Sequence, residues 1–409
     1  MKMKLSKLAA AISIAAPLAL ASSLTQASDS LLIAPEMGKI NFDARLRYED
    51  VDDNSAKKDA DALTARIRLG YLTPDFNGFK AYAEVESTTP LGSRDYNDKR
   101  LNVGSDRSQY SVIADPDNSS ELNRAWISYS GFDDTLIKLG RQRIILDNSR
   151  FVGNVGWRQN EQTYDALTVV NTSIEDTQII LSYVNDVHTI KGTHLEADAP
   201  VFNVKYSGLP FGDLTAYGYF VDVAKSGATD RDTLGLRFNG STKVSDDLSV
   251  LYTAEYAQQD IDRAVGEDKD AEYYLVEGGI KFAGITAKLS REVQQGNDGL
   301  DASFKTPLGT NHAFNGWSDM FLNTPDDGLE DTFLTLSTKV SGIKLVAVYH
   351  DFEAEDSSTD YGNEFDLMAV KSFGKNYKVL VKYANYERGD STSGRSDKDK
   401  FWIQGEVNF

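Results

Sequence analysis

Hydrophobic and polar residues alternate along one short stretch of this chain after another. In the clearest stretch, polar or charged residues separate Ile40, Phe42, Ala44, Leu46 and Tyr48. A period of two places successive side chains on opposite faces of a β-strand. The stretch therefore predicts a strand with one apolar and one polar face.

The same pattern recurs about eighteen times, in segments whose length suits strands that cross a membrane. The predicted strands are about 39–49, 62–72, 79–87, 121–130, 135–142, 164–171, 177–185, 200–207, 213–223, 232–239, 248–258, 271–282, 285–293, 332–340, 343–351, 364–373, 377–387 and 399–409. Many carry aliphatic residues in the middle and Tyr or Phe near the ends, as the aromatic girdles of a membrane barrel require.

The connectors between these segments alternate between short and long. Short, turn-like connectors include 73–78, 131–134, 283–284 and 374–376, whereas 88–120, 143–163 and 294–331 are long and polar. This rhythm is typical of an all-β, transmembrane, antiparallel up-and-down β-barrel. With an even number of strands, we expect both termini on the periplasmic side. The long connector 294–331 is expected either to fold inward or to cover the mouth.

The N-terminus indicates the compartment. A basic start precedes an apolar run at 8–20, and Thr25-Gln26-Ala27 fits a cleavage site, with a cut after Ala21 as the alternative. This is the layout of a secretory signal peptide, and no later apolar run approaches the ~20 residues of a membrane helix. We therefore predict a signal peptide at 1–27 and a single barrel domain at 28–409 in the outer membrane of a Gram-negative cell.

The last predicted strand alternates in phase up to the aromatic terminus, Phe409. Such an end resembles the assembly signal of outer-membrane proteins, which implies recognition by the barrel-assembly machinery. Outer-membrane lipid and lipopolysaccharide are the other expected partners. Acidic connectors such as 50–61 are either a solvated surface or a site where divalent cations bridge to lipopolysaccharide.

Composition narrows the function. The net charge of −19 becomes −19 − 3 = −22 once the three lysines of 1–27 are removed, which argues against nucleic-acid binding. The chain has no cysteine and only four histidines, so disulfides are excluded and a zinc site is improbable. No cofactor is expected. The chain also lacks a Gly-x-Ser-x-Gly motif, and His350 is the one histidine predicted within a strand, so we do not expect an enzyme.

The predicted lumen is more basic than the chain as a whole. Arg45 and Arg47 share the polar face of one strand with Arg66 and Arg68 of its hairpin partner, and Arg124 and Lys138 lie on the same face further along the wall. One interpretation is the scatter of charge that any wet lumen shows. The other is anion preference, because bases in a low-dielectric pore concentrate anions and guanidinium groups bind carboxylates bidentately.

Residues 139–167 carry a more specific signal. A Gly-Arg-Gln strand end, an Arg-Phe-x-Gly loop, a Trp-Arg-Gln and an aromatic-Asp-Ala strand follow one another. This stretch resembles the alginate-export family of outer-membrane porins. The resemblance implies an eighteen-strand barrel with an arginine-rich constriction that passes anionic uronate chains. It also implies that the matching residues place a folded-in loop against the wall, with guanidinium groups facing the solute; they are Arg141, Arg143, Arg150, Trp157, Arg158 and Asp165.

The chain departs from the family's archetype in one respect. The archetypal alginate secretor has a long periplasmic loop that gates its pore, and every expected periplasmic connector here is short. The favoured prediction is therefore a passive channel for small anionic solutes or uronate-type oligosaccharides. Alginate polymer export is one alternative, and a non-conducting barrel that acts as an adhesin or membrane enzyme is the other.

Overall fold

The computed structural model of this chain describes residues 37–99, 107–222, 229–263, 266–297 and 301–409. The predicted signal peptide, 1–27, lies outside these residues. The strands are β1 (Lys39–Asp53), β2 (Ala60–Leu72), β3 (Phe79–Pro90), β4 (Ser119–Phe132), β5 (Thr135–Gln142), β6 (Thr163–Asn171), β7 (Thr177–His188), β8 (His194–Leu209), β9 (Gly212–Val221), β10 (Asp230–Lys243), β11 (Leu248–Asp262), β12 (Lys269–Phe282), β13 (Ile285–Gln294), β14 (Leu329–Val340), β15 (Ile343–Glu353), β16 (Asp360–Phe373), β17 (Tyr377–Arg388) and β18 (Lys398–Asn408).

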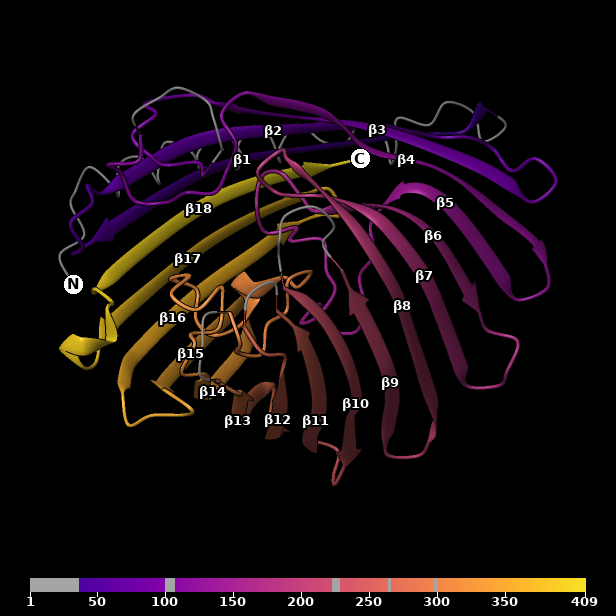
Figure 1. Cartoon of the computed structure of the whole chain (residues 1–409). Helices are drawn as coiled ribbons and strands as arrows, with labels where there is room; N and C mark the ends of the chain where they lie inside the picture. The colour runs from indigo at the N-terminus through magenta and orange to yellow at the C-terminus, as the bar shows by residue number, and fades with distance from the viewer. Residues whose placement is uncertain (1–36, 100–106, 223–228, 264–265, 298–300) are drawn as a thin grey trace.

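These eighteen strands form one closed, antiparallel barrel (Figure 1). Each strand pairs with its neighbours along the chain, and β1 closes the ring by pairing with β18. The predicted fold class and strand count are therefore confirmed. Within the described residues, the helical segments are short, as in η3 (Asn311–Ala313) and η4 (Ser391–Ser393), and no helix is long and apolar enough to cross a membrane.

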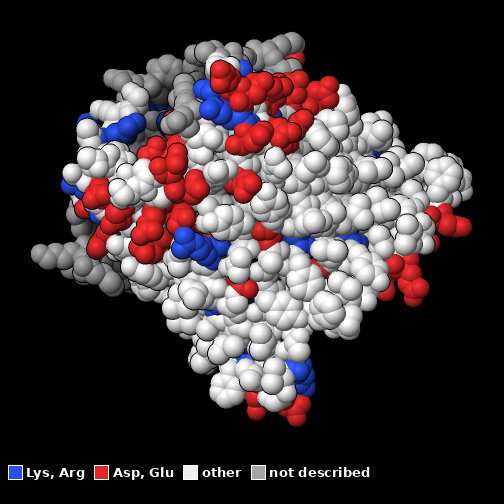
Figure 2. All heavy atoms as spheres, turned by 60° about the horizontal axis from the view of Figure 1, so that its bottom comes forward, with Lys and Arg blue, Asp and Glu red and all other residues white. Residues whose placement is uncertain are grey.

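The apolar face of the strands points outward. On β2, Ile67 and Leu69 are each 51% exposed, whereas the alternating Arg66 and Arg68 are buried inside the barrel. Figure 2 shows the result as a broad outer belt with few charged residues, next to acidic side chains that gather toward one end. An uncharged belt around a closed barrel is the surface that lipid covers.

Several strands invert this polarity beyond the belt, toward the ends that carry the long loops. On β11, Ala257 and Ile261 are buried on the inner face, while Asp260 and Asp262 face outward and are exposed. β8 does the same, with Ala199 buried inside. The inner face becomes apolar there because loops pack against it, and the outer face becomes acidic because it leaves the lipid.

The opposite end of the barrel carries the short turns. Ala283-Gly284 and Ser341-Gly342 link their strands with two residues at positive φ, which is the backbone of a tight hairpin turn. The last residue also lies at this end, where Phe409 exchanges backbone hydrogen bonds of 3.0 and 2.8 Å with Phe42. The described ends of the chain therefore meet on the turn side.

Three long connectors fold into the barrel and narrow the lumen in their described parts. These parts are 91–99 and 107–118 between β3 and β4, 143–162 between β5 and β6, and 295–297 and 301–328 between β13 and β14; the first and last are called the 91–118 and 295–328 loops. Figure 1 shows coil segments lying inside the ring of strands. Of the two outcomes predicted for the 295–328 loop, the structure has the inward one, with Phe321 packed 4.5 Å from the ring of Phe352 on β15.

Candidate functional site

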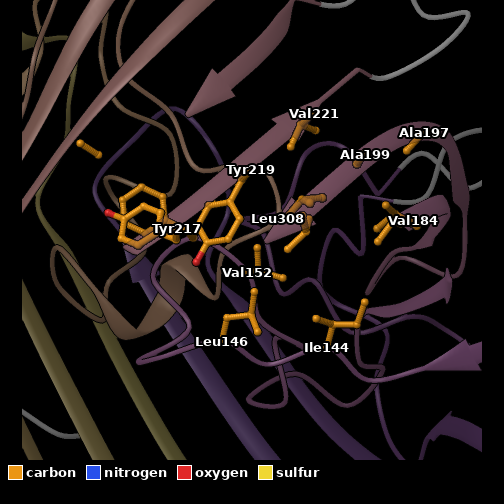
Figure 3. Packing of buried hydrophobic residues seen from close by; sticks show 14 of the residues in the cluster. Ile144, Leu146, Val152, Val184, Ala197, Ala199, Tyr217, Tyr219, Val221 and Leu308 are labelled. Atoms are coloured by element: carbon orange, nitrogen blue, oxygen red, sulfur yellow. The ribbon is translucent and has the colours of Figure 1, made fainter. Parts of the chain in front are cut away.

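The lumen and its inward loops form the candidate solute pathway. An apolar cluster holds the 143–162 loop on one side of the barrel, where Ile144, Leu146 and Val152 pack toward Tyr219 and Val221 of β9 (Figure 3). Leu308 of the 295–328 loop joins the same cluster. Burying these side chains fixes both loops against the wall.

Arginines hold the same loop on the opposite side. Arg45 of β1 donates hydrogen bonds to the backbone carbonyls of Gly156, Trp157 and Arg158 at 3.2, 3.1 and 3.0 Å. The guanidinium group of Arg47 stacks 4.2 Å from the Trp157 ring. The 143–162 loop therefore spans the lumen from β9 to β1.

Arg158 connects this loop to a second loop. Its guanidinium group lies 2.9 Å from Glu49 of β1 and 2.9 Å from Asp319 of the 295–328 loop. Burial alone would lower the pKa of Arg158, but the two carboxylates outweigh it and raise that pKa above its ordinary value. Arg150 behaves similarly: it lies 2.7 Å from Glu292 of β13 and donates to Asn315.

The wall arginines also have carboxylate partners. Nine arginines were predicted to line the pore, and all nine form ion pairs; they are Arg45–Glu406, Arg47–Asp115, Arg66–Asp43, Arg68–Glu86, Arg124–Glu84, Arg141–Asp165, Arg143–Glu161, Arg150–Glu292 and Arg158–Glu49. The tenth predicted residue, Lys138, lies 4.9 Å from the centroid of the Trp126 ring.

The structure thus brings most of the predicted residues onto one side of the barrel, on β1 to β6 and the 143–162 loop, whereas Arg150 of that loop lies across the lumen against β12 and β13. It also shows most of their guanidinium groups turned to internal partners. Arg47, Arg66 and Arg158 are at most 4% exposed, whereas Arg143 and Arg141 retain side-chain exposures of 30% and 23%. The resemblance implied that these residues place the loop and contact the solute. In the structure, Arg150 and Arg158 each contact one wall carboxylate and one residue of the 295–328 loop.

A vestibule of about 750 Å³ lies at the loop end of the barrel, between the inward loops and the ends of the strands. Six basic and two acidic side chains line it: Lys57, Lys99, Arg158, Lys191, Lys398 and Lys400, against Asp53 and Asp319. One of its lining residues, Asp319, lies 2.6 Å from Lys400 of β18. A side chamber of about 310 Å³ shares Pro307 and Leu322 with it.

Sequence reasoning missed most of these vestibule residues. Lys400 lies one residue from the outward-facing Phe401, so strand parity alone would have placed it in the lumen. Asp319 and His312 carried no such signal, because they belong to a loop without periodicity. His188 and His194, expected in a connector, end β7 and begin β8 because those strands extend further than predicted.

A closed barrel with an outer apolar belt, a charged interior and loops that narrow its lumen is an outer-membrane porin. The chain belongs to the alginate-export family, whose model matches residues 37–297. The predicted family is therefore confirmed, as is the outer-membrane location. No curated protein sequence matches the chain.

Solved porins share this fold. Acinetobacter baumannii OccAB4 has a TM-score of 0.70 at 14% identity, covering 92% of this chain and 100% of that one. The outer membrane protein opdK of Pseudomonas aeruginosa has a TM-score of 0.68 at 12% identity, covering 91% and 99%. OpdK with vanillate gives 0.68 at 13% identity, covering 90% and 98%. At these identities the likeness concerns the fold alone.

Proposed function

We propose that this porin passes small anionic solutes, with carboxylates and short uronate-type oligosaccharides as the solute class. The observation that carries the proposal is the vestibule, which six basic and two acidic side chains line in a chain of net charge −19. A basic chamber with low-dielectric walls raises the local concentration of anions. On the face that Figure 2 shows, acidic side chains gather on the outer surface toward one end.

The comparisons support the solute class in two ways. The family is described by alginate export, and alginate is a polyuronate. One structure with the same fold holds vanillate, a small carboxylate. Both facts concern other proteins, and they motivate carboxylate solutes as the first to be tested here.

The turn end favours diffusion of small solutes over export of a polymer. All the turn-end connectors of the described barrel are short, from 73–78 after β2 to 374–376 after β16. We infer that this end faces the periplasm, as the short turns of outer-membrane barrels do. A polymer exporter of the archetypal kind needs a long gating loop on that side.

Ion selectivity tests the proposal. Purified full-length protein is placed in a planar bilayer that separates two KCl concentrations. The reversal potential should shift from zero toward the equilibrium potential of chloride. The double variant Lys57→Gln/Lys99→Gln, which alters two exposed vestibule residues, should lower the anion-to-cation permeability ratio by roughly a factor of two.

The matched control for this experiment is Lys375→Gln, in the exposed turn 374–376 at the far end of the barrel. It removes a positive charge without touching the vestibule, so selectivity should stay at the wild-type value. A wild-type protein that prefers cations would contradict the proposal.

A further inference from the structure

Lys382, on the inner face of β17, lies in a box of aromatic rings. The side chain is buried, with 4% of the residue exposed. Its ammonium nitrogen lies 3.8 Å from the ring centroid of Trp317, 4.3 Å from that of Trp157 and 5.4 Å from that of Trp402. Cation–π attraction is strongest with tryptophan and grows when the cation is removed from water.

The three rings come from different parts of the molecule. Trp157 belongs to the 143–162 loop, Trp317 to the 295–328 loop and Trp402 to β18. A single ammonium group therefore contacts both inward loops and the barrel wall. We call this group of residues, completed by His312, the Lys382 clasp.

His312 fixes the fourth side of the clasp. Its ring stacks on Trp157 with centroids 4.7 Å apart and planes 6° apart. Burial and the nearby Lys382 hold the pKa of His312 well below its ordinary value, so the ring is neutral. Nε2 then accepts a hydrogen bond from Lys382 at 2.8 Å, and Nδ1–H donates to Asp319 at 2.5 Å.

Asp319 extends the connection. Burial would raise its pKa, but Lys400, His312 and Arg158 together hold that pKa well below its ordinary value. The carboxylate stays charged and links the 295–328 loop to Arg158 of the other loop and to Lys400 of β18. The chain of contacts from Lys382 to Asp319 is thus complete, with a defined donor and acceptor at each step.

The backbone next to Trp317 is held separately. The Ser318 N–H donates to Glu364 at 2.7 Å and the Trp317 N–H donates to Asp366 at 3.3 Å, both on β16. These bonds position one loop only. The clasp differs because it joins the two loops to each other and to β17 at once, next to the backbone hydrogen bonds from Gly153 to Leu308 and from Thr310 to Ser149 that also join them.

We propose that Lys382 is a positioning residue that couples the 143–162 and 295–328 loops beside β17, so that their tryptophans form one constriction of fixed width. The proposal rests on the channel function of the barrel and is independent of its anion preference. Without the ammonium group, the two loops stay joined by backbone hydrogen bonds at Leu308 and Thr310 and by the Arg158–Asp319 pair, but Trp157 and Trp317 lose the cation that holds them together against β17. The passage then widens and fluctuates.

Single-channel recording of the full-length protein tests this. Lys382→Met keeps a flexible side chain of similar length but removes the cation and the bond to His312. Its unitary conductance should be roughly twofold larger than that of wild type, with added open-channel noise from motion of the loop segments that carry Trp157 and Trp317. Liposomes containing the variant should also swell faster in a neutral trisaccharide.

Lys344→Met is the matched control. Lys344 lies on the same inner face, on β15 and close to the turns, and is exposed. Both substitutions remove one lumen charge, so a shared fall in anion preference reports charge alone. The change in conductance and noise should appear only with Lys382→Met.

A second variant tests the proposal if Lys382→Met fails to fold into a barrel that inserts in the bilayer. Trp157→Leu changes only a loop residue and removes the ring between Lys382 and Arg47. It should reproduce the larger and noisier conductance. Wild-type conductance and swelling in an inserted Lys382→Met or Trp157→Leu channel would overturn the proposal.

Discussion

Glu161 lies at the end of the 143–162 loop and is fully buried. It accepts hydrogen bonds from Arg143 and Asn123 and lies 3.6 Å from Arg68. Burial would raise the pKa of this carboxyl, but Arg68 and Arg143 lower it to about 2. One loop carboxylate therefore fixes the loop to β2 and β4 and neutralises part of the predicted arginine wall.

This pKa predicts how stability depends on pH. Because the folded pKa lies below the ordinary value of 4.5, the carboxylate stabilises the fold above about pH 4.5, and this contribution is lost as the pH falls toward 2. The shift corresponds to about 3 kcal/mol. We expect Glu161→Gln to lower the free energy of unfolding in urea by that order at pH 7.

The difference between wild type and Glu161→Gln should shrink between pH 4.5 and 2 and vanish below. Glu175→Gln, in the exposed turn between β6 and β7, should unfold like wild type throughout. If the Glu161→Gln difference were equally large at pH 7 and pH 2, ionisation of Glu161 would have no part in holding the loop.

The sequence predicted which arginines face the lumen but not what they contact. Parity along a strand suffices to place Arg45 and Arg66 inside. Their partners depend on register and on loops without periodicity, as when Asp115 of the 91–118 loop comes within 3.7 Å of Arg47. For that reason an expected row of solute-facing guanidinium groups is largely a set of internal ion pairs.

At the scale of the element, the predicted strands agree with the structure inside the apolar belt. Beyond the belt, several predicted strands end before the observed ones do. β8 was expected at 200–207 and runs from His194 to Leu209. In its added part the buried inner residues are Ala197 and Ala199, while Glu196 and Asp198 are exposed on the outside. A reversal of polarity breaks the pattern of an outward apolar face, although the chain continues as a strand.

The last strand gives an element-scale prediction about assembly. Phe409 packs 6.4 Å from Phe42 and 6.1 Å from Tyr377, at the edge of the barrel. If the terminal aromatic is mainly a signal to the assembly machinery, its deletion should strongly reduce the amount of barrel in cell outer membranes. Refolding of the same variant from urea into detergent should be nearly normal.

Phe42→Ala is the control, because it removes one of these ring contacts and keeps the terminal residue. It should assemble in cells at close to the wild-type level. An equal loss of cellular assembly and of refolding in the Phe409 deletion would assign Phe409 a structural role instead.

At the scale of the whole molecule, charge is separated in space. On the face that Figure 2 shows, acidic side chains gather on the outer surface toward one end, whereas basic side chains outnumber acidic ones six to two in the vestibule. The net charge of the chain does not reveal this difference between outer surface and vestibule. The strand pattern predicted only the basic residues of the barrel wall. Loop residues such as Lys57 and Lys99 became part of the pathway only through the fold.

The most direct test compares two sugars that differ in one group. Proteoliposomes with the full-length protein should take up galacturonate faster than galactose, because the two have nearly the same size and only galacturonate carries a carboxylate that the basic vestibule attracts. High salt should reduce the advantage by screening it. Equal rates, or faster entry of galactose at low salt, would contradict an anion-preferring channel.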